Sequence, residues 1–466
     1  MAGNRTSIHG QWSSRWAFIL AATGSAVGLG NIWRFPYLTG ENGGGVFVMV
    51  YLVCVFLVGV PILMAEVMLG RRGRQSPINT MKALAADENK AKSWQIIGWI
   101  GMLTGFLILS FYSVIAGWTL AYVVRTASGV FVGAEPALVA STFDELISDP
   151  ERLLAWHTIF MMMVIIVVSR GVKSGLEQAV RYLMPTLFIL LLVMVGYAMT
   201  TEKFMEGMRY LFVVDFDVIR QKIEAGQFFG DVFLNALGQA FFSLSLGMGA
   251  IMVYGSYLSS DSSIPRTSII IALADTGVAL LAGIAIFPIV FTYGLEPSSG
   301  PGLIFVTLTV AFAQMPGGAF FGTLFFCLLM FAAWTSAISI LEPAVAWLVE
   351  HKNMTRVKAS AIAGLAAWLL GVCTVLSFSH WAFSFPFAGQ VKTGGLFDVF
   401  DTLASNILLP LGGLLIAIFA AWVMSTDASA EELGLSNTAY KAWQFAARFI
   451  APAGVILIFL NAIGFV

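Results

Sequence analysis

The chain has 466 residues, of which 58% are hydrophobic and only 11% are charged. Soluble globular domains carry about 25% charged residues, so this composition excludes a soluble protein and indicates a polytopic membrane protein embedded in a lipid bilayer. The formal net charge of −1 says nothing about nucleic acid, but no basic block is long enough for a phosphate-binding patch, so no nucleic-acid partner is expected. The three cysteines lie in apolar segments and imply neither a disulfide framework nor a metal cluster.

Apolar runs follow one another along the whole chain. A bilayer core about 30 Å thick needs roughly 20 apolar residues in a helix, so these runs predict an all-α polytopic membrane protein with about 11 transmembrane helices. The runs lie at 15–38, 44–69, 96–124, 155–170, 178–199, 229–257, 267–292, 318–349, 358–378, 399–424 and 440–464. A shorter apolar stretch near 302–314 is expected to form a re-entrant or surface hairpin.

Positive charge predicts the orientation of these spans. Lys and Arg gather in loops that fall on one side of the membrane, at Arg71, Arg72, Arg74, Lys90, Lys92, Arg170, Lys173, Arg181, Lys352, Arg356 and Lys358. The positive-inside rule then places the N-terminus in the cytoplasm and the C-terminus outside, in a multi-pass protein of the cell (inner) membrane. The last loop, with Asp427, Glu431 and Glu432, fits this topology least well.

The first apolar run is interrupted by Gly24, Gly28 and Gly30, with Asn31 and Pro36 close behind. Glycine and proline make a poor helix interior, and backbone leaves the helix at membrane depth only where it faces protein or a water-filled cavity. The break therefore predicts a site for an ion or a polar solute. The same glycines also form a G-x-x-x-G pattern, which allows close packing of two helices, and this alternative stays open.

A second interruption occurs in the sixth run, at Ser243–Gly249. Breaks at matching places in two halves point to an inverted-repeat transporter with its site at the bilayer midplane. We therefore expect a 5+5 arrangement of helices with unwound first and sixth helices. Its parts are a cytoplasmic N-terminal segment (1–14), a first repeat (15–199), an extracellular connection (200–228), a second repeat (229–424), and a cytoplasmic loop with the eleventh helix (425–466).

The sequence of the first break resembles a known family. Gly24-Ser-Ala-Val-Gly-Leu-Gly-Asn-Ile-Trp-Arg-Phe-Pro-Tyr, followed by Glu41-Asn-Gly-Gly-Gly, looks like the first-helix signature of neurotransmitter:sodium symporters. This family includes the bacterial leucine and multihydrophobic amino-acid transporters. The resemblance extends through Trp118 and the Ser243–Gly249 break to Thr335-Ser336. It implies the leucine-transporter-like fold and sodium-coupled uptake of a small molecule by alternating access.

Two sodium sites are implied by the resemblance. One would use the carbonyls of Gly24, Val27 and Ala332 with the hydroxyls of Thr335 and Ser336. The other would use the Ala26 carbonyl, Asn31, Ser243 and Asp275, completed by the substrate's carboxylate. Hard cations prefer several oxygen ligands, which such groups supply. Alternatives remain: a helix–helix hydrogen bond for the hydroxyl pair, and a protonated or hydroxyl-paired Asp275.

Asp275 departs from many relatives, which have an amide at this position. Animal members often need chloride nearby, and the matching positions here are Tyr51, Gln239, Ser243 and Ala279. Ala279 cannot donate a hydrogen bond, and Asp275 already supplies a negative charge. We therefore expect transport that is independent of chloride.

Gly28 predicts the class of substrate. Amine-selective relatives carry an aspartate there, so glycine implies a substrate that brings its own carboxylate. Its charged ends would meet main-chain and hydroxyl groups of Ala26, Gly28, Leu29, Gly30, Tyr112, Phe242, Ser243, Ser245 and Ser336. Its side chain would meet Ile108, Ile115, Met248 and Ile340. This favours a neutral, hydrophobic L-amino acid; the alternative is another small zwitterion, such as a taurine- or betaine-like solute.

The resemblance also implies two gates. Arg34 and Asp401 would pair on the outer side above a lid of Tyr112 and Phe242, although Arg34 could instead snorkel to the interface. His9, where relatives carry an arginine, would pair with Glu350 on the cytoplasmic side, and Arg5 is the alternative partner. Gly175 and Pro185 near the start of the fifth span have a spacing that, in similar transporters, opens a water path to sodium; Glu66 is expected to satisfy N–H groups of the broken helices.

Other classes remain as rivals. Broken helices can line a channel pore, and a receptor-like sensor can use the same site. An enzyme is not expected, because the four histidines lie near predicted span ends and show no metal-ligand spacing.

Overall fold

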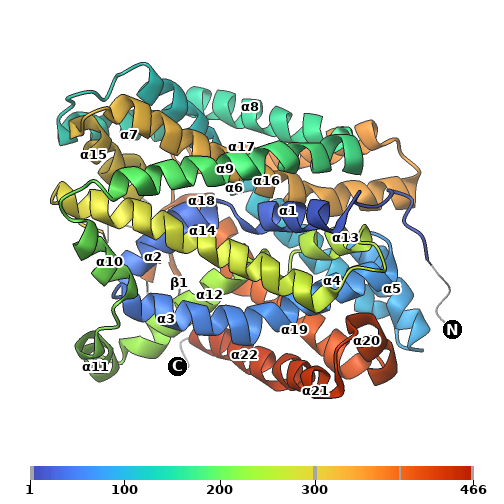
Figure 1. The fold of residues 1–466 in the computed structure, drawn as a ribbon. Coiled ribbons are helices and arrows are strands. Elements are labelled where there is room, and N and C mark those ends of the chain that lie inside the picture. The colour runs from blue at the N-terminus through green and yellow to red at the C-terminus, as the bar shows by residue number, and fades with distance from the viewer. Residues whose placement is uncertain (1–4, 298–301, 388–389, 463–466) are drawn as a thin grey trace.

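The computed structural model describes residues 5–297, 302–387 and 390–462. In this part the chain is a bundle of helices whose long members run side by side (Figure 1), with one antiparallel hairpin of strands β1 (Phe385–Phe387) and β2 (Gln390–Lys392). This confirms the predicted all-α polytopic class.

The helices up to residue 224 cover the first five expected spans. They are α1 (Arg15–Ala26), η1 (Gly30–Arg34), α2 (Phe35–Glu41), α3 (Gly45–Cys54), η2 (Val55–Gly59), α4 (Val60–Gly73), α5 (Pro77–Asp87), η3 (Lys92–Gln95), α6 (Ile96–Ala127), α7 (Pro136–Ser148), α8 (Pro150–Ser169), η4 (Val172–Glu177), α9 (Gln178–Ala198), α10 (Phe204–Phe212) and α11 (Phe216–Glu224).

The remaining helices cover spans six to eleven. They are η5 (Phe228–Phe233), α12 (Leu234–Ser243), α13 (Ala250–Ser256), α14 (Ile264–Thr292), η6 (Leu303–Thr307), α15 (Leu308–Gln314), α16 (Gly318–Lys352), α17 (Arg356–Ser377), α18 (Gly395–Asp401), η7 (Thr402–Leu408), α19 (Leu409–Ile418), η8 (Phe419–Val423), α20 (Thr426–Leu433), α21 (Asn437–Phe445), η9 (Ala446–Ile450) and α22 (Ala451–Ala462).

Of the eleven expected spans, the described residues contain 9 helices long and apolar enough to cross a membrane, and the bent pair α1 with η1–α2 makes a tenth. The sixth expected span, 229–257, is divided into η5, α12 and α13, none of which is long enough alone. Both predicted breaks are therefore present. The stretch 302–314 forms one short helix, η6–α15, whose side chains are largely buried, so the expected hairpin is not found there.

The centre of the bundle is occupied by α6 and α16, which pack along each other and lie in the middle of Figure 1. They are the third helices of the two predicted repeats. Each is apolar around most of its circumference and largely buried, as expected of a helix surrounded by other helices. By contrast, α9 buries only one side and turns large side chains such as Ile189 and Leu192 outward. The division into two repeats as domains stays a prediction.

Basic and acidic side chains meet at the end of the bundle where the N-terminus lies, together with α5 and α20 (Figure 1). Arg71 forms an ion pair of 2.5 Å with Glu432, and Arg72 lies 3.6 Å from Glu431. The acidic last loop therefore neutralises arginines of the second span, which explains its acidity on a side that is otherwise basic.

Both breaks have a clear local cause. Helix α1 ends at Ala26 because Val27 is extended (ψ 108°), and the second segment leaves at 50° to the first. After α12, the chain passes through positive φ at Ser245, Gly247 and Gly249. A Cβ on Gly247 would lie 2.3 Å from the Leu409 carbonyl oxygen, so only glycine fits this approach.

Candidate functional site

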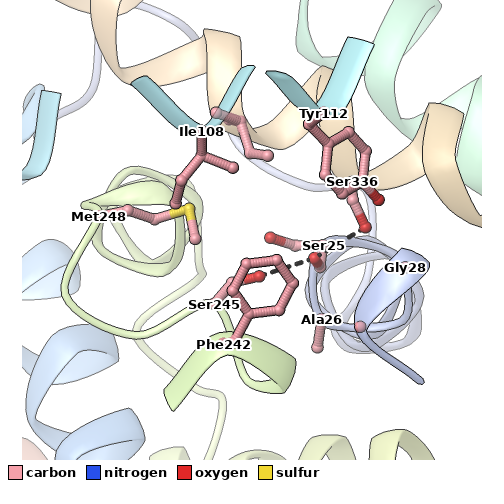
Figure 2. Close-up of a pocket in the computed structure, with 11 residues that line it drawn as sticks. Ser25, Ala26, Gly28, Ile108, Tyr112, Phe242, Ser245, Met248 and Ser336 are labelled. Atoms are coloured by element: carbon pink, nitrogen blue, oxygen red, sulfur yellow. Dashed lines mark hydrogen bonds between the residues drawn. The ribbon is translucent and has the colours of Figure 1, made fainter. Parts of the chain in front are cut away.

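A cavity of about 270 Å³ lies where the two broken helices face α6 and α16 (Figure 2). It is lined by Ser25, Ala26, Gly28, Gly30, Ile108, Tyr112, Phe242, Ser245, Met248, Ser336 and Ile340. The structure thus brings together the residues predicted to bind substrate, except Leu29 and Ser243, and Ile115 also lies outside the lining.

One end of the cavity is polar because backbone groups are bare at the break. The Ser25 carbonyl oxygen accepts hydrogen bonds from the hydroxyls of Ser245 (2.8 Å) and Ser336 (3.1 Å), drawn as dashed lines in Figure 2. The Ser25 hydroxyl donates to Ser339 of α16 (2.7 Å). Ser25 was missed by the sequence analysis, although its position inside the glycine run was the available signal.

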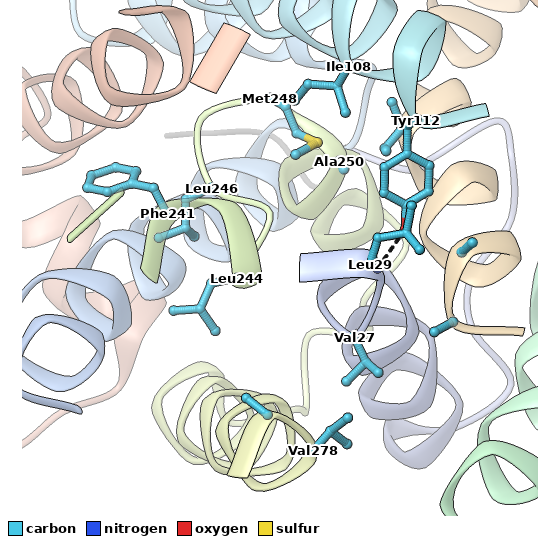
Figure 3. Packing of buried hydrophobic residues seen from close by; sticks show 14 of the residues in the cluster. Val27, Leu29, Ile108, Tyr112, Phe241, Leu244, Leu246, Met248, Ala250 and Val278 are labelled. Atoms are coloured by element: carbon cyan, nitrogen blue, oxygen red, sulfur yellow. Dashed lines mark hydrogen bonds between the residues drawn. The ribbon is translucent and has the colours of Figure 1, made fainter. Parts of the chain in front are cut away.

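The Leu29 N–H was predicted to meet the substrate and has another partner here. It donates to the Tyr112 hydroxyl oxygen at 3.1 Å, shown as a dashed line in Figure 3. Leu29 therefore positions Tyr112 rather than lining the cavity. Behind the break, Val27 and Leu244 are fully buried among apolar side chains, so the backbone on this side is sealed from water.

The other end of the cavity is apolar. Ile108 of α6 and Met248 of the second break lie across the cavity from Gly28 and Ser336 (Figure 2), and Ile340 of α16 completes this wall. A thioether side chain adapts its shape, so Met248 allows more than one apolar occupant. The cavity accordingly has a polar half made by main chain and hydroxyls and an apolar half made by side chains.

The five groups predicted for one sodium ion converge between α1 and α16. The Ser336 hydroxyl lies 3.3 Å from the Gly24 carbonyl oxygen and 3.0 Å from that of Val27. The Thr335 hydroxyl lies 3.1 Å from the Ala332 carbonyl oxygen. Thr335 also lies close to the first helix, because a Cβ added to Gly24 would be 3.3 Å from the Thr335 Cβ. These are neutral oxygen donors of the kind that a hard monovalent cation takes.

The side chains predicted for the other sodium ion also lie together. The Asn31 amide donates to Asp275 Oδ1 at 2.7 Å and to the Ser243 hydroxyl oxygen at 3.0 Å. The Ser243 hydroxyl donates to Asp275 Oδ2 at 2.6 Å. Asp275 is completely buried in α14. Ser243 therefore belongs to this polar cluster rather than to the cavity wall. Ala26, the fourth predicted group, lines the cavity instead.

The four positions that correspond to a chloride site are adjacent to this cluster. The Tyr51 hydroxyl lies 3.4 Å from the Ser243 hydroxyl, and the Gln239 amide donates to the Gly30 carbonyl at 2.8 Å. Ala279 is buried and has no side-chain donor. The donors of Ser243 and Gln239 are thus already used within the protein.

The two side chains predicted to form the inner gate lie against each other. His9 Nε2 lies 3.1 Å from Glu350 Oε1, and both side chains are almost fully buried. Glu350 also accepts from the Ser76 N–H (2.7 Å) and the Asn79 amide (2.7 Å), at the start of α5. The Trp12 indole N–H donates to the Tyr254 carbonyl at 3.0 Å. The N-terminal segment is thereby held against the end of α13.

The predicted outer pair is not formed. In the part of the chain that the structure describes, Arg34 makes no ion pair with Asp401; its guanidinium lies over the Phe242 ring, 4.8 Å from the centroid. Asp401 accepts from the Ser405 hydroxyl at 2.8 Å instead. Phe242 and Tyr112 both line the cavity, so Arg34 packs on an aromatic wall residue in place of the predicted charge pair.

One buried acid was not anticipated. Glu342 of α16 contacts the Arg356 guanidinium at the start of α17 and accepts from the Tyr257 hydroxyl at 2.7 Å. From the sequence, Arg356 is only one of several basic residues in a loop. A carboxylate inside an apolar span was the available signal, since such a group requires a partner.

Glu66, which was expected to accept hydrogen bonds from N–H groups of the broken helices, accepts one from the Gly247 N–H at 2.5 Å.

Comparison with known proteins agrees with this geometry. A model of the Sodium:neurotransmitter symporter family matches residues 9–131 and 141–465. The chain is 40% identical over 458 residues to the sodium-dependent transporter YhdH of Bacillus subtilis, covering 97% of this chain and 98% of that protein. It is 34% identical over 461 residues to a sodium-dependent transporter of Haemophilus influenzae, covering 97% of each.

A solved structure is also similar. The crystal structure of MhsT in complex with L-phenylalanine matches with a TM-score of 0.87 and 42% identity, over 97% of this chain and 99% of that chain. This confirms the leucine-transporter-like architecture. The relatives are sodium-dependent transporters, which excludes the enzyme reading and indicates that this protein uses sodium and crosses the membrane several times. The chain therefore belongs to the sodium:neurotransmitter symporter family.

Proposed function

We propose that this transporter couples inward movement of sodium to uptake of a neutral, hydrophobic L-amino acid by alternating access. The observation that carries the proposal is the two-part cavity, which has main-chain and hydroxyl groups at one end and Ile108, Met248 and Ile340 at the other. An α-amino acid has the same division between its charged backbone and its side chain.

The polar half favours a zwitterion. None of the described residues lining the cavity carries a charge, so a substrate with a net charge would be buried without a counter-ion. A carboxylate can instead complete the sodium shell at Asn31 and Asp275, while the ammonium group meets carbonyl oxygens at the breaks. A Cβ on Gly28 would lie 2.5 Å from the Ser336 hydroxyl oxygen, so an aspartate cannot serve an amine there.

The apolar half favours a hydrophobic side chain. Burial of apolar surface contributes about 25 cal/mol of binding free energy per Å². A taurine- or betaine-like solute buries less apolar surface in this pocket and would therefore bind more weakly. MhsT, at 42% identity, is seen in complex with L-phenylalanine, which supports a substrate of the same kind. The flexible Met248 between two glycines is suited to side chains of different sizes.

Two sodium ions fit the two clusters of oxygen atoms. Substrate and sodium would bind cooperatively, because the carboxylate supplies a ligand to one ion. This mutual dependence of sodium and substrate binding distinguishes a symporter from a channel, in which ions can flow without a bound substrate.

A sodium-dependent binding screen tests the proposal. Purified protein is titrated with the twenty amino acids, with taurine, betaine and biogenic amines as controls, in sodium and in choline buffer. Neutral hydrophobic amino acids are expected to bind at least tenfold more tightly than the controls, and only in sodium. Tight binding of an amine that lacks a carboxylate would overturn the argument from Gly28.

Transport is expected to be independent of chloride, because Asp275 provides a fixed anion and the Ser243 hydroxyl already donates to it. Replacing chloride by gluconate should change sodium-driven uptake into proteoliposomes by less than threefold. Asp275→Asn should lower uptake at least tenfold, whereas Asp261→Asn, an exposed acid, should not. A threefold or larger loss in gluconate for the unmodified protein would contradict the prediction.

A further inference from the structure

A second groove lies on the outer surface of the bundle, at the end that carries the N-terminal segment. Its volume is about 520 Å³, and α8, η4, α9 and α16 form its walls. The lining residues are Val167, Arg170, Ser174, Gly175, Gln178, Ala179, Tyr182, Leu183 and Trp334. None of them belongs to the cavity described above, so the transport site does not account for this groove.

The lining changes character along the groove. Arg170, Ser174 and Gln178 stand where α8 ends and α9 begins, which is the level of the membrane surface. Further along α9 and on α16 the lining is Ala179, Leu183 and the Trp334 ring. Polar groups at a helix end followed by apolar side chains match the order of groups in a phospholipid, from headgroup to acyl chain.

Positive charge around the mouth of the groove is not neutralised. Arg170, Lys173 and Arg181 are exposed, and within the described residues none of them forms an ion pair. The neighbouring acid, Glu177, accepts hydrogen bonds from the Ser13 N–H (3.0 Å) and the Ser13 hydroxyl. Glu177 keeps its charge, but the three cations Arg170, Lys173 and Arg181 outnumber it, so the local surface is electropositive and complements an anionic headgroup rather than a zwitterionic one.

Trp334 adds an independent observation. Its indole Nε1 is buried and has no hydrogen-bond acceptor among the described residues, although its ring lines the groove. Because this N–H is itself inaccessible from the groove, it selects no headgroup, and Trp334 lines the groove with the apolar part of its ring, which suits an acyl chain.

We propose that this groove is a specific binding site for an anionic phospholipid. Arg170 would face the phosphate, with Ser174 and Gln178 as further donors, and one acyl chain would lie along Leu183 and Trp334. The groove also includes Gly175, so a bound lipid would pack directly on η4 at the start of the fifth span.

Native mass spectrometry of the detergent-purified full chain tests this proposal. The protein is titrated with phosphatidylglycerol and with phosphatidylcholine of identical acyl chains. Phosphatidylglycerol is expected to bind at least about 25-fold more tightly, since Arg170 and Lys173 each contribute about fivefold. In Arg170→Gln/Lys173→Gln this preference should fall roughly 25-fold, about fivefold for each cation near an anionic surface. Ala179→Trp, which fills the groove, should weaken both lipids.

Matched controls separate the site from general effects. Lys82→Gln/Lys90→Gln removes two exposed cations at the same end of the molecule, and Ala361→Trp adds an indole to an exposed position of α17. Both should leave lipid affinity within twofold of the unmodified protein. Sodium-dependent amino-acid binding by each variant shows that it is folded.

Three outcomes would overturn the proposal. Equal affinities for the two lipids would show that charge does not select the occupant. Equal losses in the Arg170/Lys173 and Lys82/Lys90 variants would place the effect outside the groove. A dimer that forms in the unmodified protein and disappears in Ala179→Trp would assign the groove to a second copy of the chain.

Discussion

Gly28 lies in the break of the first span, in close contact with the hydroxyl groups of two neighbouring helices. A Cβ there would lie 2.5 Å from the Ser336 hydroxyl oxygen and 2.6 Å from that of Tyr112. Both hydroxyls line the cavity, so any side chain at this position displaces groups that would contact substrate.

Gly28→Ala should therefore weaken sodium-dependent amino-acid binding at least tenfold, as measured by equilibrium binding to purified protein. Gly277→Ala is the matched control, since a Cβ on Gly277 meets nothing within 4 Å. Full affinity in Gly28→Ala would mean that the substrate does not approach this backbone.

Glu350 is the residue on which the inner closure depends. It accepts hydrogen bonds from His9, Ser76 and Asn79, and hydrogen bonds to a charged group contribute about 1.5–3 kcal/mol each. Glu350→Ala should release the N-terminal segment, and hydrogen exchange at residues 5–13 should rise at least tenfold.

His9→Ala should also raise hydrogen exchange at residues 5–13, but by less, because Glu350 loses only one of its three hydrogen-bond partners. Glu431→Ala provides the control, as that side chain is 78% exposed and lies 3.6 Å from Arg72. Unchanged exchange and uptake in both His9→Ala and Glu350→Ala would remove the basis for this gate.

At the scale of the element, the fifth span begins as the π-helix η4 rather than as a regular α-helix. Gly175 lies inside this segment, and a Cβ on it would come within 2.2 Å of the Val167 carbonyl oxygen of α8. Pro185 follows within α9 and removes one backbone donor. We expect this to be the part of the span that opens, because the π-helical start and Pro185 both interrupt the regular backbone hydrogen bonds.

Gly175→Ala should separate α8 from η4 and lower sodium-driven uptake at least tenfold. Gly196→Ala, in the same span, should leave uptake within twofold, because a Cβ there has open space. Equal uptake by the two variants would show that the contact between η4 and α8 is not required for transport.

For the whole molecule, the charge that crosses the membrane sets how far uptake can proceed. Two sodium ions with a zwitterion would carry two positive charges inward. Each gains about 2.3 kcal/mol per 100 mV, which is roughly 50-fold in equilibrium accumulation.

Proteoliposomes clamped with valinomycin should therefore accumulate substrate more strongly as the interior becomes negative, with the slope giving the net charge. Liposomes in sodium-free medium serve as the control. Accumulation that ignores the imposed potential would show that another cation leaves in exchange, and would contradict net movement of charge.

Much of the fold could be predicted from the sequence, since lipid requires about 20 apolar residues for each span and satisfies no backbone groups. The positions of both breaks followed from glycines at Gly24, Gly28 and Gly247. The residues that converge on the cavity were identified through the family resemblance. From sequence alone, an apolar helix residue such as Ile108 or Ile340 cannot be distinguished from an ordinary core residue. The sixth span could not be resolved into its three helices by hydropathy alone.

Tertiary structure decided which partner each polar group takes. Arg34 lies on Phe242 and not beside Asp401, Leu29 donates to Tyr112, and Ser243 serves Asp275 rather than the cavity. The sequence by itself determined the membrane class, the number of apolar runs and the two breaks, because these depend on the chemistry of consecutive residues. Only the folded chain decided the hydrogen-bond partners, because a buried donor takes whichever acceptor the packing of distant helices brings within about 3 Å.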